Sequence, residues 1–283
     1  MSDVGGSGQA WHRLKSDKKA MVSMAVLVVL ALVAALGPFV VPHDPTAQAF
    51  DILQSPSLQH PMGTDSLGRD VLSRVIAGAR VSAMVGLGVA FIGMLIGVTL
   101  GLLAGFFGGR VDDLISRYVD LQWAFPELIL AIALISIFGA GVDKVIIAIA
   151  FAYVDDFARL ARAEALRLKQ EEFVLAARVT GISSRGIITG EILPNAIGPL
   201  VVQATIAVGL GILGEATLTF LGLGVEPSTP TWGLILEESR DFFQQAWWLG
   251  IFPGLAIVVT VLSLNLLGDS LRDALDVRGP ETV

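Results

Sequence analysis

The sequence has no cysteine and only three histidines, and these two shortages exclude several kinds of chemistry. Without a thiol, the chain has no disulfide, no zinc–thiolate site and no cysteine nucleophile. The histidines are His12, His43 and His60, which lie far apart in the sequence, and no two of them have a metal-ligand spacing. The sequence therefore predicts no metal site.

Phosphate-binding motifs are also missing. No lysine is directly preceded by glycine, so the chain lacks the Gly-x4-Gly-Lys-Ser/Thr loop that cradles ATP phosphates. The formal net charge is −7, and no basic stripe is present to neutralise nucleic-acid phosphates. No cluster of nucleophile, base and metal ligand is visible. We expect no enzyme activity, no cofactor held by this chain and no nucleic-acid partner.

Charge is scarce as well, at 16% of residues, whereas 54% are hydrophobic. A soluble domain usually carries about 25% charged residues. The apolar residues gather in long blocks, which is typical of membrane-spanning helices. Six blocks are predicted to cross the membrane: residues 21–41, 81–107, 118–142, 143–160, 192–214 and 246–267. The sequence thus predicts an all-α membrane protein.

The first block has two interpretations, a membrane anchor or a cleaved signal peptide. The apolar part of a signal peptide is roughly 7–15 residues long, and the uncharged stretch from Met21 to Val41 is longer. Residues 47–49 resemble a cleavage site but lie well beyond this stretch. We therefore favour an uncleaved anchor.

The distribution of basic residues predicts the orientation. If both termini are cytoplasmic, 14 of the 19 lysines and arginines fall on the inner side. Inner loops of membrane proteins are enriched in these residues, so the opposite orientation is rejected.

The second block contains a regular series of glycines. Gly93, Gly97, Gly101, Gly105 and Gly109 are each four residues from the next, so they share one face of a helix. Such a face lets two helix backbones approach closely within lipid. It is interpreted either as packing within the subunit or as part of a moving interface.

Among the acidic residues in or beside predicted spans, two are of particular interest. Glu127 follows Pro126, where a proline is expected to kink the third span. Glu215 follows the fifth block. Ionisable residues at membrane depth are costly and usually face protein or water. Each is therefore either a buried structural group or part of a translocation path or gate.

The longest charged stretch is residues 155–195, and its apolar residues recur at helical spacing. Gly181 and Gly186 interrupt that pattern, and Ser183 and Ser184 between them favour the start of a helix. The stretch predicts a helix, a turn and a short helix, followed by Pro194 in the first turn of the next span.

Within this stretch, the run Ala176-Ala177-x3-Gly181-x9-Glu191-Ile192-Leu193-Pro194 resembles the EAA loop of binding-protein-dependent ABC permeases. The family pattern is Glu-Ala-Ala, three residues, Gly, nine residues, Ile-x-Leu-Pro. The chain departs from it at two positions, where Leu175 replaces the usual Glu and Glu191 replaces the Ile.

Three further segments resemble the C-type permease of dipeptide, oligopeptide and nickel importers. They are His60-Pro61-Met62-Gly63-Thr64-Asp65-Ser66-Leu67-Gly68-Arg69-Asp70-Val71-Leu72-Ser73-Arg74, Glu215-Ala216-Thr217-Leu218-Thr219-Phe220-Leu221-Gly222-Leu223-Gly224 and Asn265-Leu266-Leu267-Gly268-Asp269-Ser270-Leu271-Arg272-Asp273-Ala274-Leu275-Asp276. The resemblance therefore covers nearly the whole chain.

This resemblance implies the transmembrane fold of a type I ABC importer in a bacterial or archaeal cytoplasmic membrane. It implies three kinds of partner besides the lipid: a second permease, two ATPase subunits that bind ATP and Mg²⁺, and an extracytoplasmic solute-binding protein. It also implies that the loop docks on an ATPase. The residues expected there are Ala176, Ala177, Arg178, Gly181, Ser183, Ser184, Arg185, Leu193 and Pro194.

Two questions of function stay open at this stage. The imported solute is expected to be a dipeptide or oligopeptide, with nickel or another small solute as the alternative. A secondary transporter, which would need no ATPase, is a rival from another class.

We expect the chain to divide into two parts. Residues 1–80 are expected to hold the N-terminal cytoplasmic segment, the first span and an outer loop. Residues 81–283 are expected to form a five-helix permease core that includes the coupling loop.

Overall fold

A computed structural model describes residues 12–275. These residues form helices, loops and one isolated β-bridge between Thr64 and Asp70, so the all-α prediction is confirmed. The helices are α2 (Lys18–Val40), α3 (Val71–Phe107), α4 (Gly109–Trp123), α5 (Glu127–Phe138), α6 (Val142–Ala152), α7 (Val154–Leu168), α8 (Glu172–Val179), α9 (Ser184–Ile187), the π-helical turn η1 (Ile188–Ile192), α10 (Leu193–Phe220), α11 (Trp232–Phe242) and α12 (Trp248–Leu275).

Within residues 12–275, four helical stretches are long and apolar enough to cross a membrane. They are Lys18–Gly37 in α2, α3, the stretch Ser184–Phe220 that ends in α10, and α12. The bent pair of α4 and α5 would make a fifth. Because α6 has only 11 residues, it is too short to cross a hydrocarbon core of about 30 Å alone, so the sixth span stays a prediction.

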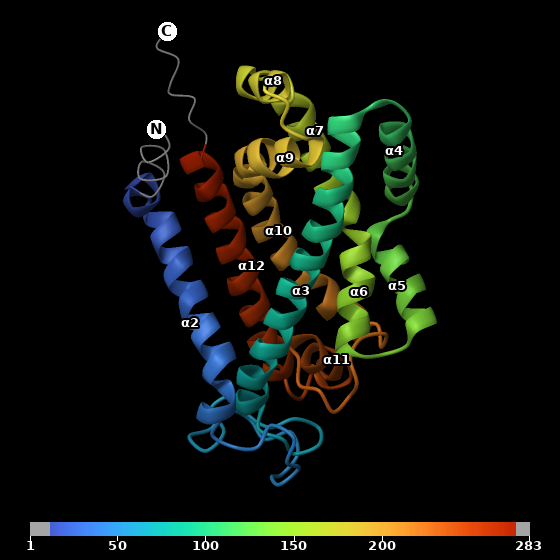
Figure 1. The fold of residues 1–283 in the computed structure, drawn as a ribbon. Coiled ribbons are helices and arrows are strands. Elements are labelled where there is room, and N and C mark those ends of the chain that lie inside the picture. Colours follow the sequence, from blue (N-terminus) through green and yellow to red (C-terminus); the bar gives the residue numbers. More distant parts are fainter. Residues whose placement is uncertain (1–11, 276–283) are drawn as a thin grey trace.

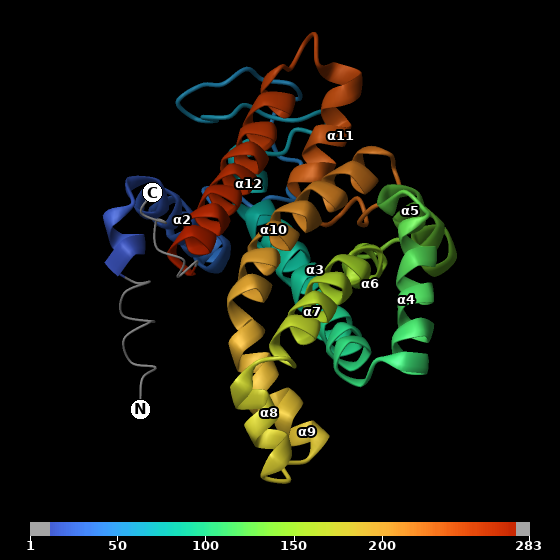
Figure 2. The same ribbon diagram turned by 90° about the horizontal axis from the view of Figure 1, so that it is seen from above.

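The bundle has two distinct ends (Figure 1). The start of α2, the end of α12 and the helices α8 and α9 lie at one end, whereas α11 and the loop of residues 41–70 lie at the other. Seen along the bundle, α8 and α9 project beyond the spans beside the start of α10 (Figure 2). The chain termini lie outside the described residues, so their cytoplasmic location stays a prediction.

Helix α3 forms the centre of the bundle and packs against α2, α6, α7 and α10. It starts ten residues before the predicted block because the Asp70 side chain caps it, accepting a hydrogen bond from the Ser73 amide at 2.8 Å. At about 1.5 Å per residue, its 37 residues exceed the thickness of the hydrocarbon core. The expected division at residue 80 falls inside this helix, and the division stays a prediction.

The glycine face of α3 packs within the subunit, against α7. A Cβ atom added to Gly97 would lie 2.5 Å from the Val154 carbonyl oxygen, and one added to Gly105 would lie 2.7 Å from the Ala165 Cβ. Gly93 and Gly101 meet the same helix. Gly109 does not belong to this face, because α3 ends at Phe107 and Gly109 starts α4 with a φ of +52°.

The predicted kink at Pro126 is a complete break. Helix α4 ends at Trp123, α5 begins at Glu127, and the two axes differ by 91°. Proline cannot donate the hydrogen bond that a continuous helix needs, and it disfavours helical geometry in the residue before it. The predicted third span is therefore two helices, and α5 turns back to pack against α6.

The contact between α3 and α7 predicts a marked effect of a single methyl group. Gly97→Ala places a Cβ against the backbone of α7, which cannot move away as a flexible side chain could. We expect the free energy of unfolding to fall by about 1–3 kcal/mol, measured by denaturant titration of the purified protein in detergent.

Gly254→Ala is the matched control, since it lies within a spanning helix and an added Cβ meets no atom within 4 Å. We expect it to be neutral or stabilising by up to about 1 kcal/mol, because alanine favours a helix more than glycine does. Equal effects of the two variants would contradict the close contact.

Candidate functional site

The predicted coupling loop consists of three helices at one end of the bundle, rather than two. Helix α7 ends at Leu168, α8 follows after a short turn, and α9 comes after a second turn. The additional turn lies at residues 169–171, where no glycine or proline gave a sequence signal.

The turn after α8 depends on Gly181, which has a φ of +82°. Its amide donates to the Arg178 carbonyl, and the Ile182 amide donates to the Ala177 carbonyl, both at 3.1 Å. This pair of bonds is the Schellman arrangement that ends many helices, and glycine adopts the required positive φ without strain. The predicted turn at Gly181 is therefore confirmed.

Helix α9 begins where the two serines predict. The Ser183 hydroxyl accepts a hydrogen bond from the Gly186 amide at 3.2 Å, so Ser183 is the N-cap and Ser184 the first helical residue. Both serines and Arg185 are exposed. Gly186 does not end this helix.

Helix α9 continues into α10 through η1. In this wider turn the Leu193 amide reaches back five residues to the Ile188 carbonyl. Pro194 follows immediately, near the start of α10, where its missing N–H and its ring would disturb a regular helix. Residues from Ser184 to Phe220 thus form one helical stretch from the end of the bundle into the membrane.

The buried side of these helices is tied to the spans. Val174, Ala177 and Ile187 belong to one core cluster with Leu102 of α3 and Phe157 of α7. The Arg178 guanidinium lies 5.2 Å from the centre of the Phe106 ring, at the end of α3. The Lys169 ammonium donates to the Gly105 carbonyl at 2.8 Å.

The outer side of the same helices is unusually apolar for a charged loop. Val179, at the end of α8, is 89% exposed. Leu175 in α8 and Ile182 in the turn that follows are exposed as well. Ala176 is also exposed, whereas Ala177 is buried and Leu193 half-buried. We call Leu175, Val179 and Ile182 the apolar tip.

Glu215 is fully buried near the other end of α10. Its carboxylate accepts hydrogen bonds from Thr219 at 3.0 Å and Ser82 at 3.5 Å, and also bonds the hydroxyl of Thr231, the N-cap of α11. The three hydroxyls come from α10, α3 and the start of α11. This arrangement favours a structural role over exposure to a translocation path.

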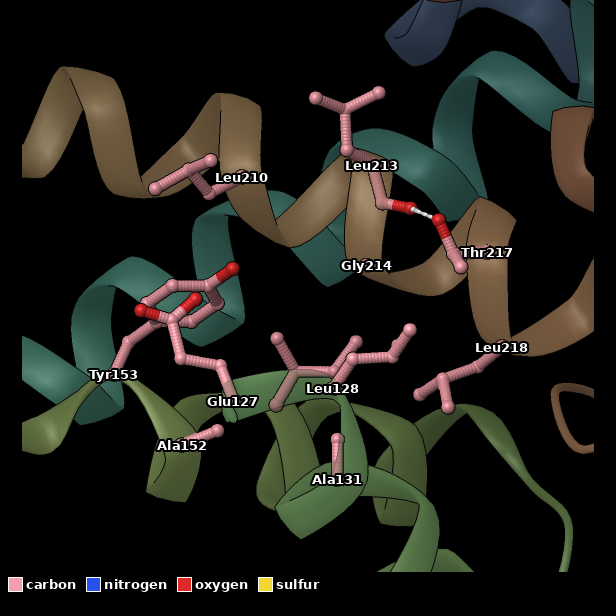
Figure 3. Close-up of a pocket in the computed structure, with 11 residues that line it drawn as sticks. Glu127, Leu128, Ala131, Ala152, Tyr153, Leu210, Leu213, Gly214, Thr217 and Leu218 are labelled. Atoms are coloured by element: carbon pink, nitrogen blue, oxygen red, sulfur yellow. Dashed lines mark hydrogen bonds between the residues drawn. The ribbon is translucent and has the colours of Figure 1, made fainter. Parts of the chain in front are cut away.

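Glu127 lies in a different environment. It lines a cavity of about 190 Å³ between α5, α6 and α10. Its carboxylate lies beside the Tyr153 ring, and Leu210 and Leu213 of α10 lie across the cavity (Figure 3). Because Glu215 does not line this cavity, the two acidic residues that the sequence grouped together occupy separate sites.

A buried charge cluster at the opposite end of the bundle was missed by sequence reasoning. Asp65, Arg69, Arg74 and Glu238 form it. The Arg74 guanidinium contacts Asp65 at 2.5 Å and Glu238 at 2.6 Å. Arg69 contacts the same two carboxylates at 2.6 and 2.5 Å.

Only the resemblance of residues 60–74 marked this segment as special. Glu238 belongs to this cluster and not to the solvated surface, since its side chain is only 15% exposed. Arg74 and Glu238 are 164 positions apart, and no local sequence pattern indicates that they form a pair. The charge cluster joins the loop before α3 to α11.

Asp70 in the same segment is held as an anion. Burial alone would raise its pKa, but hydrogen bonds from His60 and Ser73 outweigh that effect, so the pKa of Asp70 lies below its ordinary value. An ionised carboxylate at the N-terminus of α3 also complements the helix dipole.

A long glycine-faced central helix, a neighbouring span broken at Pro126 and a helical loop continuous with a span characterise this membrane protein. Residues 97–278 match the model of the binding-protein-dependent transport system inner membrane component. Residues 7–61 match the N-terminal transmembrane domain of oligopeptide transport permease C. The chain belongs to this family of inner-membrane transport permeases, and its location is the inner membrane.

Curated relatives agree with this family. The dipeptide transport system permease protein DppC of Alkalihalophilus pseudofirmus is 42% identical over 95% of this chain and 88% of its own. The di/tripeptide permease DppC of Pseudomonas aeruginosa is 41% identical over 94% and 90%. The glutathione transport system permease protein GsiD of Escherichia coli is 44% identical over 94% and 88%.

The fold resembles a solved transporter. The inward-facing MetNI methionine ABC transporter superposes with a TM-score of 0.59 at 20% identity, over 71% of this chain and 96% of that chain. The predicted type I importer fold is therefore confirmed.

The charge cluster predicts a large cost for removing one of its members. Arg74→Ala leaves the Asp65 carboxylate buried with one cation fewer. We expect the free energy of unfolding to fall by about 3–5 kcal/mol, measured by denaturant titration in detergent.

Arg80→Ala is the control, because Arg80 is an exposed arginine on the same helix. A surface arginine should contribute about 0–1 kcal/mol. If Arg74→Ala were no more destabilising than Arg80→Ala, the cluster would not stabilise the fold.

Proposed function

We propose that this chain is one of two permease subunits of an ATP-driven importer of small peptides. The observation that carries the proposal is the apolar tip, which sits on a helical stretch continuous with α10. An exposed apolar surface of this kind is suited to a protein partner. Partner ATPases are expected to hold ATP and Mg²⁺. This chain is expected to line the solute path and to transmit movement of the ATPases to the spans.

The mechanical argument follows from the connections of the loop. A force applied at Gly181 or Ser184 acts on α9, and α9 runs without a break through η1 into α10. The same force acts on α3 and α7 through the core around Val174 and Ile187. Closure of two ATPase subunits on ATP would then bias the spans between two arrangements, one open to each side of the membrane.

The relatives support a peptide as the solute. Their names specify dipeptides, di/tripeptides and glutathione, all of which are short peptides. We therefore favour peptide import over import of nickel or another small solute. The solute-binding protein is expected to dock on the outer end, at the loop of residues 41–70 and α11.

The cavity beside Glu127 is the proposed part of the solute path. Among the described residues that line it, Glu127 supplies a carboxylate that a peptide amino group could pair with. Glu215 is instead proposed to position α11. It is buried, and one of its three hydroxyl partners, Thr231, lies at the start of α11.

The coupling role predicts that Gly181→Val lowers dipeptide uptake at least tenfold while ATP hydrolysis continues. Uptake is measured with a radiolabelled dipeptide and the reconstituted transporter. Valine is strained at a φ of +82°, so the turn must change shape and the apolar tip must move.

Gly222→Val controls for the strain itself. Gly222 has a φ of +78° and open space around its Cβ position, but it lies after α10 at the other end of the bundle. We expect its uptake to fall less than threefold. A second variant, Val179→Glu, charges the tip without backbone strain and should also abolish uptake. Normal uptake by Val179→Glu, or uptake driven by an ion gradient without ATPases, would contradict the proposal.

The two acidic residues predict opposite outcomes. Glu127→Ala should lower dipeptide uptake at least fivefold and leave thermal stability unchanged, because this residue borders a cavity. Glu215→Ala should lower stability by about 1–3 kcal/mol, because it leaves buried hydroxyls unpaired. Reduced uptake by Glu215→Ala at full stability would instead place Glu215 in the path.

A further inference from the structure

The structure brings together two histidines and an aspartate that the sequence keeps apart. His43, His60 and Asp70 lie in the loop before α3 and at its N-terminus, at the outer end of the bundle (Figure 1). One ligand atom from each residue lies within 4.8 Å of the others. The sequence argument considered only spacing along the chain, whereas the folded loop brings the rings of His43 and His60 to 5.4 Å from each other.

The nitrogen and oxygen atoms of the three side chains lie close enough together to bind one ion. The His60 Nδ1 lies 2.8 Å from Asp70 Oδ1, and the His43 Nδ1 lies 3.8 Å from Asp70 Oδ2. Two ligand atoms bound to one tetrahedral zinc ion are about 3.4 Å apart. The two separations, 2.8 and 3.8 Å, lie on either side of this value.

His43 provides an independent sign of a missing partner. Its Nδ1 atom is buried and makes no hydrogen bond, although its backbone amide bonds the Ser73 hydroxyl. Buried polar atoms nearly always have a partner, and a site for a bound ion is one recognised reason for an exception. A hydrogen bond between His60 and Asp70 would account for those two residues, but it leaves His43 unexplained.

The surroundings have the features of a metal site. The Ser73 hydroxyl and amide donate to Asp70 Oδ2 at 2.7 and 2.8 Å, and such bonds orient a ligating carboxylate. The Phe50 ring packs at 4.9 Å from the His43 ring and 4.4 Å from the His60 ring, which excludes water from one side. The His43 side chain is 34% exposed, so an ion can enter from the solvent.

We propose that His43, His60 and Asp70 form a binding site for a divalent transition metal, with Zn²⁺ as the ion that fits best. Two imidazoles and one carboxylate are a common zinc ligand set, and a water completes the coordination. Asp65 is not a ligand, because Arg69 and Arg74 already hold it. The bound ion links the loop after α2 to the start of α3, and the site does not depend on the proposed transport function.

The test is zinc binding by the full-length chain, purified in detergent with an affinity tag that contains no histidine. Mass spectrometry of bound metal after dialysis against Zn²⁺ should give one ion per chain. Co²⁺ in place of zinc should give the visible absorption bands of a tetrahedral site. Zinc should also raise the unfolding temperature of the wild type.

His43→Ala is the decisive variant, because the unbonded Nδ1 atom can be lost without breaking a hydrogen bond of that ring. We expect at least about a tenfold rise in the zinc dissociation constant, loss of the cobalt bands, and an unfolding temperature that zinc no longer raises. His12→Ala is the control, since His12 is exposed near α2 and should leave all three readings unchanged.

Three outcomes would overturn the site. They are less than one zinc ion per wild-type chain, equal zinc affinity in the wild type and His43→Ala, or a loss of zinc affinity in His12→Ala as large as that in His43→Ala. Since these are binding measurements on the chain alone, failure of transport would not affect them, and their failure would not affect the transport proposal.

Discussion

The close contact between the glycine face of α3 and helix α7 is the constraint on which the rest of the structure depends. Because Gly97 and Gly105 bring the two backbones together, α7 crosses the centre of the bundle and leads directly to α8. The core that holds Val174 and Ile187 then forms between α3, α7 and α10. Without this contact, the loop would act on the spans only through α10, with which α9 is continuous.

The sequence predicted those features that depend on neighbouring residues. Gly181 and Ser183 mark a helix end and a helix start through local hydrogen bonds, and both positions were correct. The glycine series predicted a packed face because helical spacing alone aligns it. Pro126 was located correctly, but its effect was underestimated, because the size of a bend depends on what the flanking helices pack against.

Features that depend on distant residues could not be predicted. Glu238 pairs with Arg69 and Arg74 across most of the chain, and His43 meets His60 only because the loop of residues 41–70 folds back. Glu127 and Glu215 looked alike in the sequence, yet one lines a cavity and the other is enclosed by hydroxyls. The end of the bundle with α11 contains the buried charge cluster, whereas α8 and α9 are attached to the spans mainly through an apolar core.

In the proposed function, α8 and α9 bind an ATPase subunit. The chain has no cysteine, so Val179→Cys introduces one thiol on the most exposed residue of the apolar tip. In the assembled transporter, a short bifunctional cross-linker should join this thiol to an ATPase subunit, whereas Leu58→Cys, fully exposed at the outer end, should give no such product. A cross-link from residue 58 and none from residue 179 would contradict the account.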